Sequence, residues 1–225
     1  MELIDQSLGQ LARRIASATR LFDAHQLDSC CAGNRSLRSA AANAGLDPAP
    51  IVAELQALEG RTEAREERDW SDASSPELVD HILARYHAVH REQLPELIRL
   101  ARKVEQVHQE HADCPRGLAD HLETMAQELE SHIRKEEDVL FPLITQGHGA
   151  TVGAPITVLR MEHDEHGAAL RRVDELTNAM APPGKACPTW CTLYTGLKTF
   201  RQDLVAHIHT ENNILFERFA PAVVH

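Results

Sequence analysis

The strongest constraint on the fold is a short motif that occurs twice in the chain. Residues 132–142 read HIRKEEDVLFP and residues 207–217 read HIHTENNILFE. Both copies spell His-Ile-x-x-Glu-x-x-(Val/Ile)-Leu-Phe, so each places a histidine four positions before a glutamate. Residues four apart share one face of an α-helix. The motif therefore predicts two helices that each present a His/Glu pair on one face.

The residues that lead into each copy indicate which face this is. Apolar residues recur at alternating steps of three and four, as on a helix that packs in a bundle core. The first series is Leu118, Leu122, Met125, Leu129, His132, Glu136 and then Leu140 or Val139. The second is Leu193, Leu197, Phe200, Leu204, His207, Glu211 and then Ile214 or Leu215. Both His/Glu pairs are therefore expected to be buried.

Buried carboxylates need a compensating partner, because an unpaired one costs on the order of several kcal/mol. A metal ion with oxygen and imidazole ligands would satisfy both pairs together. The alternative is a His–Glu hydrogen bond on a solvent face. That interpretation suits a single pair better than two matched pairs that both continue an apolar series.

Four amphipathic segments follow Pro76, separated by short stretches rich in glycine and proline. The expected helices span residues 76–110, 116–145, 154–180 and 188–219, and the short connections predict antiparallel neighbours. Pro95 is expected to kink or divide the first of these helices. The first and third helices each place an H-x-x-H on the apolar face, His87 with His90 and His163 with His166. Periodicity does not separate the two members of either pair.

The predicted fold is therefore all-α, with a four-helix bundle in residues 76–225. Histidines from all four helices and glutamates from two would meet in its core, a donor set that suits iron, manganese or zinc. Residues 1–60 are expected to form a small helical domain, in which Ser36 caps a helix that Gly45 stops. Residues 61–75, which are charged and then rich in Ser and Asp, are expected to be a linker.

Cys30 and Cys31 lie in the small domain, just before a predicted turn. One interpretation is two small buried residues, and the other is a reactive redox thiol pair. His209 is expected to face solvent.

Composition excludes several classes of protein. Acidic residues outnumber basic ones by 34 to 23, which argues against a nucleic-acid-binding surface. No apolar run approaches the roughly 20 residues of a membrane span. The five cysteines do not indicate a disulfide framework, and the N-terminus lacks the pattern of a signal peptide. We therefore expect a cytoplasmic protein.

The motifs resemble the di-iron proteins for repair of iron centres (the ScdA/YtfE family) in the hemerythrin-like superfamily. The matching segments are LGQLARRI, DSCCAG, RYHAVHREQLPEL, ELESHIRKEEDVLFP, EHDEHG, the PP-x-x-AC-x-TW segment and HIHTENNILFER. They are distributed over nearly the whole chain. In DSCCAG, Ser29 and Ala32 replace an aromatic residue and a glycine of the usual family pattern.

This resemblance implies a hemerythrin-like bundle with two non-haem iron ions and an oxo or hydroxo bridge. The implied ligands are His87, His132, Glu136, His163, His207 and Glu211, and the resemblance alone selects His87 over His90 and His163 over His166. Glu136 and Glu211 would bridge the irons. Glu128 and Glu162 match acidic residues beside the site, where they would line an access path.

The implied function is repair of iron–sulfur clusters damaged by nitrosative or oxidative stress, through iron delivery, nitric oxide handling or both. The implied partners are damaged iron–sulfur proteins, with nitric oxide, oxygen or peroxide as small ligands. Two alternatives stay open, an oxygen-binding or nitric oxide-binding sensor without a repair role, and a helical protein whose His/Glu pairs are only structural. The sequence shows no general base or nucleophile outside the expected metal ligands, so it leaves open whether the chain is an enzyme.

Overall fold

The computed structural model describes residues 2–15, 18–27, 29, 33–59 and 70–219. These residues form helices and turns, and the β structure among them is limited to an isolated bridge between Ser7 and Ser36. The prediction of an all-α fold is confirmed. The chain divides into two compact units, residues 1–78 with 205–225 and residues 79–204.

The N-terminal part of the first unit is a cluster of short helices around a small apolar core. After the 3-10 turn η1 (Leu3–Asp5) come α1 (Leu8–Arg14), α2 (Ala18–Ala24), α3 (Leu37–Asn43) and α4 (Pro48–Glu59). Their inward faces bury Leu8, Leu11, Phe22, Leu37 and Leu55, among other apolar residues. These helices have seven to twelve residues each. Isolated helices of this length are marginal in water, so the shared core holds them.

Local capping decides where these helices begin and end. The Ser7 hydroxyl accepts from the backbone N–H of Gln10, whose side chain in turn accepts from the N–H of Ser7, a reciprocal capping box. The Ser36 hydroxyl caps α3, and Gly45 follows that helix with a φ of +68°. The predicted cap at Ser36 is confirmed.

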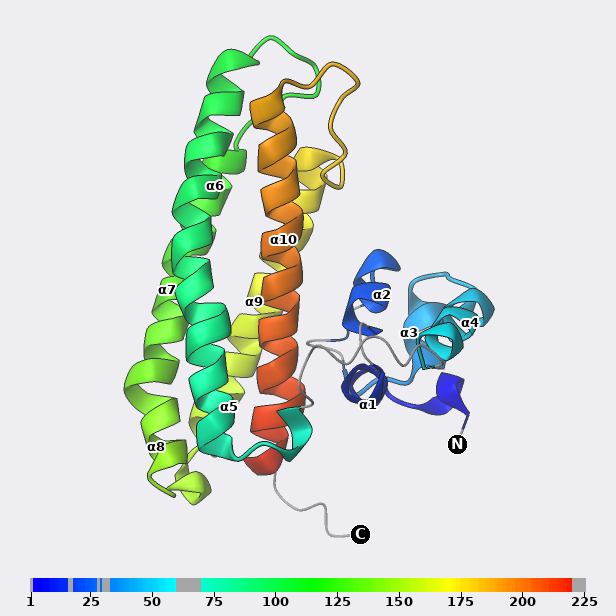
Figure 1. Ribbon diagram of the computed structural model, residues 1–225, viewed down its shortest axis with the longest axis vertical. Coiled ribbons are helices and arrows are strands. Elements are labelled where there is room, and N and C mark those ends of the chain that lie inside the picture. The colour runs from blue at the N-terminus through cyan, green and yellow to red at the C-terminus, as the bar shows by residue number, and fades with distance from the viewer. Residues whose placement is uncertain (1, 16–17, 28, 30–32, 60–69, 220–225) are drawn as a thin grey trace. The chain divides into compact units, whose positions relative to one another are not determined.

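Four long helical segments make up the bundle (Figure 1). The first contains α5 (Ser75–Ile82), the π turn η4 (Leu83–His87) and α6 (Ala88–Val107). The second contains α7 (Leu118–Lys135), the π turn η5 (Glu136–Leu140) and α8 (Phe141–Thr145). The third is α9 (Gly153–Thr177). The fourth contains α10 (Pro188–Thr210), the π turn η7 (Glu211–Leu215) and the 3-10 turn η8 (Phe216–Phe219). Two further 3-10 turns, η3 (Trp70–Asp72) and η6 (Gly149–Thr151), lie in connections.

The long helices bury the faces that the apolar series predicted. The leucines, Met125 and Phe200 of the two motif series are buried, and the series continue through Leu140 and Leu215 rather than Val139 and Ile214. Val139 is 49% exposed. In the first segment Leu83, where the π turn η4 begins, is only half-buried. Pro95 does not divide α6, which continues on both sides of it.

Contacts between these helices hold the core together. Helix α6 packs on α7, and α7 packs on α9. Helix α10 meets α6 closely at Gly196, where an added Cβ would come within 2.8 Å of Leu97 Cδ2. An ion pair between Arg201 and Asp174 joins α10 to α9. None of the described helices has the length and apolar character needed to cross a bilayer.

Candidate metal centre

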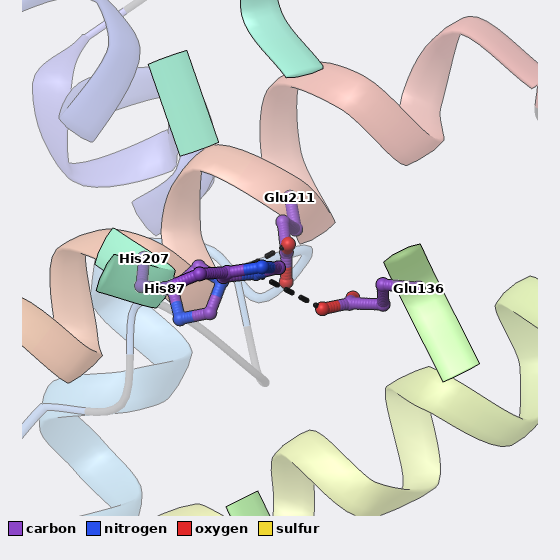
Figure 2. Close-up of side chains that lie close together, drawn as sticks. All are labelled: His87, Glu136, His207 and Glu211. Carbon is purple, nitrogen blue, oxygen red and sulfur yellow. Dashed lines mark hydrogen bonds and ion pairs between the residues drawn. The ribbon is translucent and has the colours of Figure 1, made fainter. Parts of the chain in front are cut away.

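Six buried side chains come together as two overlapping groups of candidate metal ligands. One group contains His87, Glu136, His207 and Glu211, and the other contains His132, Glu136, His163 and Glu211. In each group the candidate ligand atoms lie within 4.8 Å of one another. Figure 2 shows the first group, with its imidazole and carboxylate groups directed toward one another. The structure thus brings together the six residues that the family resemblance selected.

The two groups share both glutamates and divide the four histidines. Glu136 directs its two oxygens to different histidines, Oε2 to His87 Nε2 at 3.3 Å and Oε1 to His132 Nε2 at 3.3 Å. His207 Nε2 lies 3.0 Å from Glu211 Oε1, and His132 Nε2 lies 3.1 Å from His163 Nε2. A carboxylate that serves two groups through separate oxygens has the arrangement of a bridging ligand between two metal ions.

Two further carboxylates hold the outer nitrogens of the histidines. His87 Nδ1 lies 3.0 Å from Glu137 Oε1, and His132 Nδ1 lies 2.9 Å from Glu162 Oε2. An ionised carboxylate only accepts hydrogen bonds, so we assign the imidazole proton to Nδ1 in both rings. This tautomer leaves both Nε2 lone pairs directed at Glu136, and that of His132 also lies against His163 Nε2. A cation between the Nε2 atoms and the Glu136 oxygens would turn these lone-pair contacts into ligand bonds, as in carboxylate–histidine–metal sites.

Basic residues keep the two outer carboxylates ionised. Partial burial opposes ionisation of Glu137, but hydrogen bonds from Arg91 and His87 outweigh it and place the pKa of this carboxyl below its ordinary value. The pKa of Glu162 is lowered in the same way, because hydrogen bonds from Lys135 and His132 outweigh the effect of partial burial. Both carboxylates therefore remain acceptors for imidazole N–H groups at neutral pH.

π turns place three of the six candidate ligands. His87 ends η4, Glu136 begins η5 and Glu211 begins η7. A π turn inserts an extra residue into a helix, and such turns occur frequently at functional sites. The donor set is imidazole and carboxylate, which suits iron, manganese or zinc. The residues present therefore fit a metal centre of this kind.

The other predicted site residues have different positions. His90 and His166 are buried but belong to neither group of candidate ligands. Burial chiefly lowers the pKa of His90, to about 4. Glu128 is exposed on α7, whereas Glu162 is half-buried against His132. Cys30 and Cys31 lie outside the described residues, so both interpretations of this pair stay predictions.

The prediction that His209 faces solvent is wrong. His209 is only 6% exposed, and its Nδ1 lies 3.0 Å from the side-chain nitrogen of Asn213. Burial, together with the positive charge of Arg13, lowers the pKa of His209 to about 4. The sequence carried a signal for this burial. The second motif copy has uncharged residues where the first has charged ones at Arg134, Lys135 and Asp138.

Sequence reasoning also missed Glu137 as a partner of the site. Its position in the charged run KEED is typical of a solvated face, whereas in the structure it lies in the π turn that begins at Glu136 and contacts His87. We find no feature of the sequence that would have predicted the three π turns.

Comparisons with known proteins match both parts of the chain. The family model described as "Hemerythrin HHE cation binding domain" matches residues 78–219, and the ScdA_N model, described as a domain of unknown function, matches residues 4–59. The chain is 48% identical to the iron-sulfur cluster repair protein YtfE of Pectobacterium atrosepticum, over 95% of this chain and 96% of that protein. The chain is also 48% identical to the protein of the same name from Yersinia pseudotuberculosis, over 97% of this chain and 98% of that protein.

Proposed function

Since the chain belongs to the hemerythrin HHE family, among the iron-sulfur cluster repair proteins, we propose that it repairs damaged iron–sulfur clusters and holds two non-haem iron ions for this purpose. The family relationship indicated by the sequence motifs is confirmed by these matches. The identity extends over nearly the full length of the relatives, so both matched segments contribute to the assignment.

The observation that carries the proposal is the sharing of Glu136 and Glu211 between the two groups of histidines. One iron would be held by His87 and His207, and the other by His132 and His163. Each glutamate would contribute to both ions, and an oxo or hydroxo bridge would complete the pair. The Glu136 oxygens support this assignment, because they already face histidines of different groups.

The protein's own groups prepare this centre in a defined way. Glu137 and Glu162 hold the imidazole protons of His87 and His132 at Nδ1, which leaves Nε2 available as a ligand atom. Arg91 and Lys135 keep these carboxylates charged. When bound, the iron pair would supply coordination positions for nitric oxide, oxygen or peroxide and a store of iron for delivery to damaged iron–sulfur proteins.

Three finer assignments belong to the same proposal. Cys30 and Cys31 would serve as redox thiols in the N-terminal domain. Glu128 and Glu162 would line an access path to the irons, with Glu162 supported by its contact with His132. We also place the protein in the cytoplasm, where the reducing environment keeps cysteines as thiols.

Metal content tests the centre directly. We expect protein purified without oxygen to contain two coupled irons per chain by elemental analysis and Mössbauer spectroscopy. The double variant Glu136→Ala/Glu211→Ala should lose both. The double variant Asp138→Ala/Glu165→Ala removes two exposed carboxylates from nearby positions and is the matched control, which should retain both irons. Full iron content in the first double variant would contradict the proposed ligand set.

Repair is tested on a purified [4Fe–4S] enzyme whose cluster has been damaged by nitric oxide. The iron-loaded protein should restore activity of that enzyme, and the Glu136→Ala/Glu211→Ala variant should not. Stable reversible oxygen binding without any restoration would favour the alternative, a hemerythrin-like binding or sensing module.

A further inference from the structure

Asn213 connects the N-terminal helices to the π turn that carries Glu211. It lies two residues after Glu211 within η7 and is 8% exposed. Its side-chain nitrogen lies 3.3 Å from the backbone oxygen of Ser29 and 3.0 Å from His209 Nδ1, and donates to both. Its backbone oxygen accepts a hydrogen bond from Arg13 in α1. Both the side chain and the main chain of Asn213 are thus held by the N-terminal domain.

Two glycines leave the space that the Asn213 amide occupies. A Cβ added at Gly9 would lie 2.6 Å from Asn213 Oδ1, and one added at Gly33 would lie 2.5 Å from the same atom. The N–H of Gly9 donates to the backbone oxygen of Gly33 at 2.8 Å, which fixes the two glycines side by side. No side chain larger than hydrogen fits at either position while the amide stays in place.

These contacts lie within one compact unit, because residues 205–225 group with the N-terminal residues. Helix α1 packs directly on η7. A π turn is rarer than continuous α-helix, and this one is contacted from outside by Arg13 and Ser29 through Asn213. The turn begins at Glu211, which belongs to both groups of candidate ligands. A shift of the turn would therefore move a donor of both metal positions.

We propose that Asn213 is a positioning residue through which docking of the N-terminal helices holds Glu211 in place and so raises the affinity of the metal centre. The inference rests on the proposed function, because Glu211 must be a ligand. It assigns to the N-terminal domain a mechanical role in metal retention, separate from any chemistry of its cysteines. In this proposal Gly9 and Gly33 contact the Asn213 amide, and the backbone of η7 connects Asn213 to Glu211. We call this series of contacts the link.

A double-mutant cycle between Gly9 and Asn213 tests this link. Alanine has a higher helix propensity than glycine, so Gly9→Ala does not weaken α1 itself. The closest contact of the added Cβ is the 2.6 Å approach to Asn213 Oδ1, followed by a 3.1 Å approach to the backbone oxygen of Gly33. The displaced amide would lose its bonds to Ser29 and His209. We expect Gly9→Ala to weaken Co²⁺ and Fe²⁺ binding by about tenfold, the scale seen when a partner that orients a ligand is removed. Asn213→Ala should weaken binding by a similar factor.

The combined variant Gly9→Ala/Asn213→Ala distinguishes the link from a general loss of stability. Without the amide, the Cβ added at Gly9 loses its closest contact and keeps a 3.1 Å approach to the backbone oxygen of Gly33, so the double variant should bind metal with an affinity close to that of Asn213→Ala alone. Independent effects would instead multiply. Arg14→Ala, at an exposed position of α1, is the matched control and should leave metal affinity unchanged.

Hydrogen exchange of the metal-free protein provides the second readout. Gly9→Ala and Asn213→Ala should each speed amide exchange in residues 207–215, and Arg14→Ala should not. The inference is overturned if Gly9→Ala leaves both metal affinity and exchange in residues 207–215 at wild-type values. If the wild-type chain binds neither ion, the proposed function fails and the effect on affinity fails with it. The exchange result then still decides whether Asn213 holds the turn.

Discussion

The two copies of the motif have nearly the same sequence and very different surroundings. In the first copy Arg134, Lys135 and Asp138 are exposed. In the second copy the residues at the equivalent positions, His209, Thr210 and Asn213, are buried. Both copies nevertheless place their histidine and glutamate in the same core.

This difference distinguishes the features that the motif itself encodes from those that depend on the surrounding structure. The spacing of histidine, glutamate and apolar residues is common to both copies and directs the candidate ligands inward. The residues between them face outward, where the first copy meets solvent and the second meets α1. The charged side chains of the first copy would be costly in the second environment. The sequence therefore differs between the copies at the positions where the environment differs.

The largest effect that would test this comparison is the loss of a shared ligand. Glu211→Ala removes a donor from both groups, whereas His163→Ala removes one from a single group. We expect Glu211→Ala to weaken binding of both metal ions by more than about a hundredfold, beyond the effect of losing an orienting partner. Titration with Co²⁺ followed by optical spectroscopy would measure both steps. Selective loss of only one ion in Glu211→Ala would refute the sharing of this carboxylate.

Exchanging residues between the copies tests the effect of environment. His209→Arg places the first copy's charge in the buried site of the second and should lower the free energy of unfolding by about 3 kcal/mol. The reverse change, Arg134→His on the exposed face of α7, should change it by less than about 0.5 kcal/mol. Urea denaturation of the metal-free variants would measure both values. Equal effects of the two substitutions would contradict the difference in surroundings.

Acid provides a third test, because His209 has a folded-state pKa of about 4 against an ordinary value of 6.5. The unfolded chain binds a proton at His209 between these values and the folded chain does not, so folding stability falls as pH decreases from 6.5 to 4. The contribution that is present above pH 6.5 and lost in this window is up to about 3 kcal/mol. His209→Gln should make the stability of the metal-free protein less dependent on pH between 4 and 6.5. An unchanged pH dependence would count against the neutral buried state.

The smallest expected effect concerns the first copy. Its histidine, His132, is oriented by Glu162 of α9. Glu162→Gln weakens the acceptor that holds His132 Nδ1 and should reduce metal affinity by roughly tenfold, at the low end for such partners. Glu165→Gln on an exposed face of α9 is the control and should have no effect. Isothermal titration with Mn²⁺ would measure the metal affinity of both variants. If Glu162→Gln and Glu165→Gln bind Mn²⁺ equally well, Glu162 does not contribute to metal binding.

Much of the fold was predictable because helical periodicity records burial. The apolar series from Leu118 to Glu136 and from Leu193 to Glu211 identified faces that the structure buries. Cap residues such as Ser36 marked a helix start. Periodicity could not decide whether His87 or His90 is the candidate ligand, since residues three apart share a face of a helix. The choice depends on which ring reaches Glu136, and the family resemblance supplied it.

The sequence by itself determined the helices, their buried faces and the two pairs His132/Glu136 and His207/Glu211, because these depend on residues close together in the chain. Only the tertiary structure decided how the pairs combine, since the sharing of Glu136 and Glu211 depends on groups from separate helices. It also decided the π turns and the burial of His209 and Asn213. The burial of His209 and Asn213 depends on contacts with residues far away in the sequence, and no local pattern of side chains encodes such contacts.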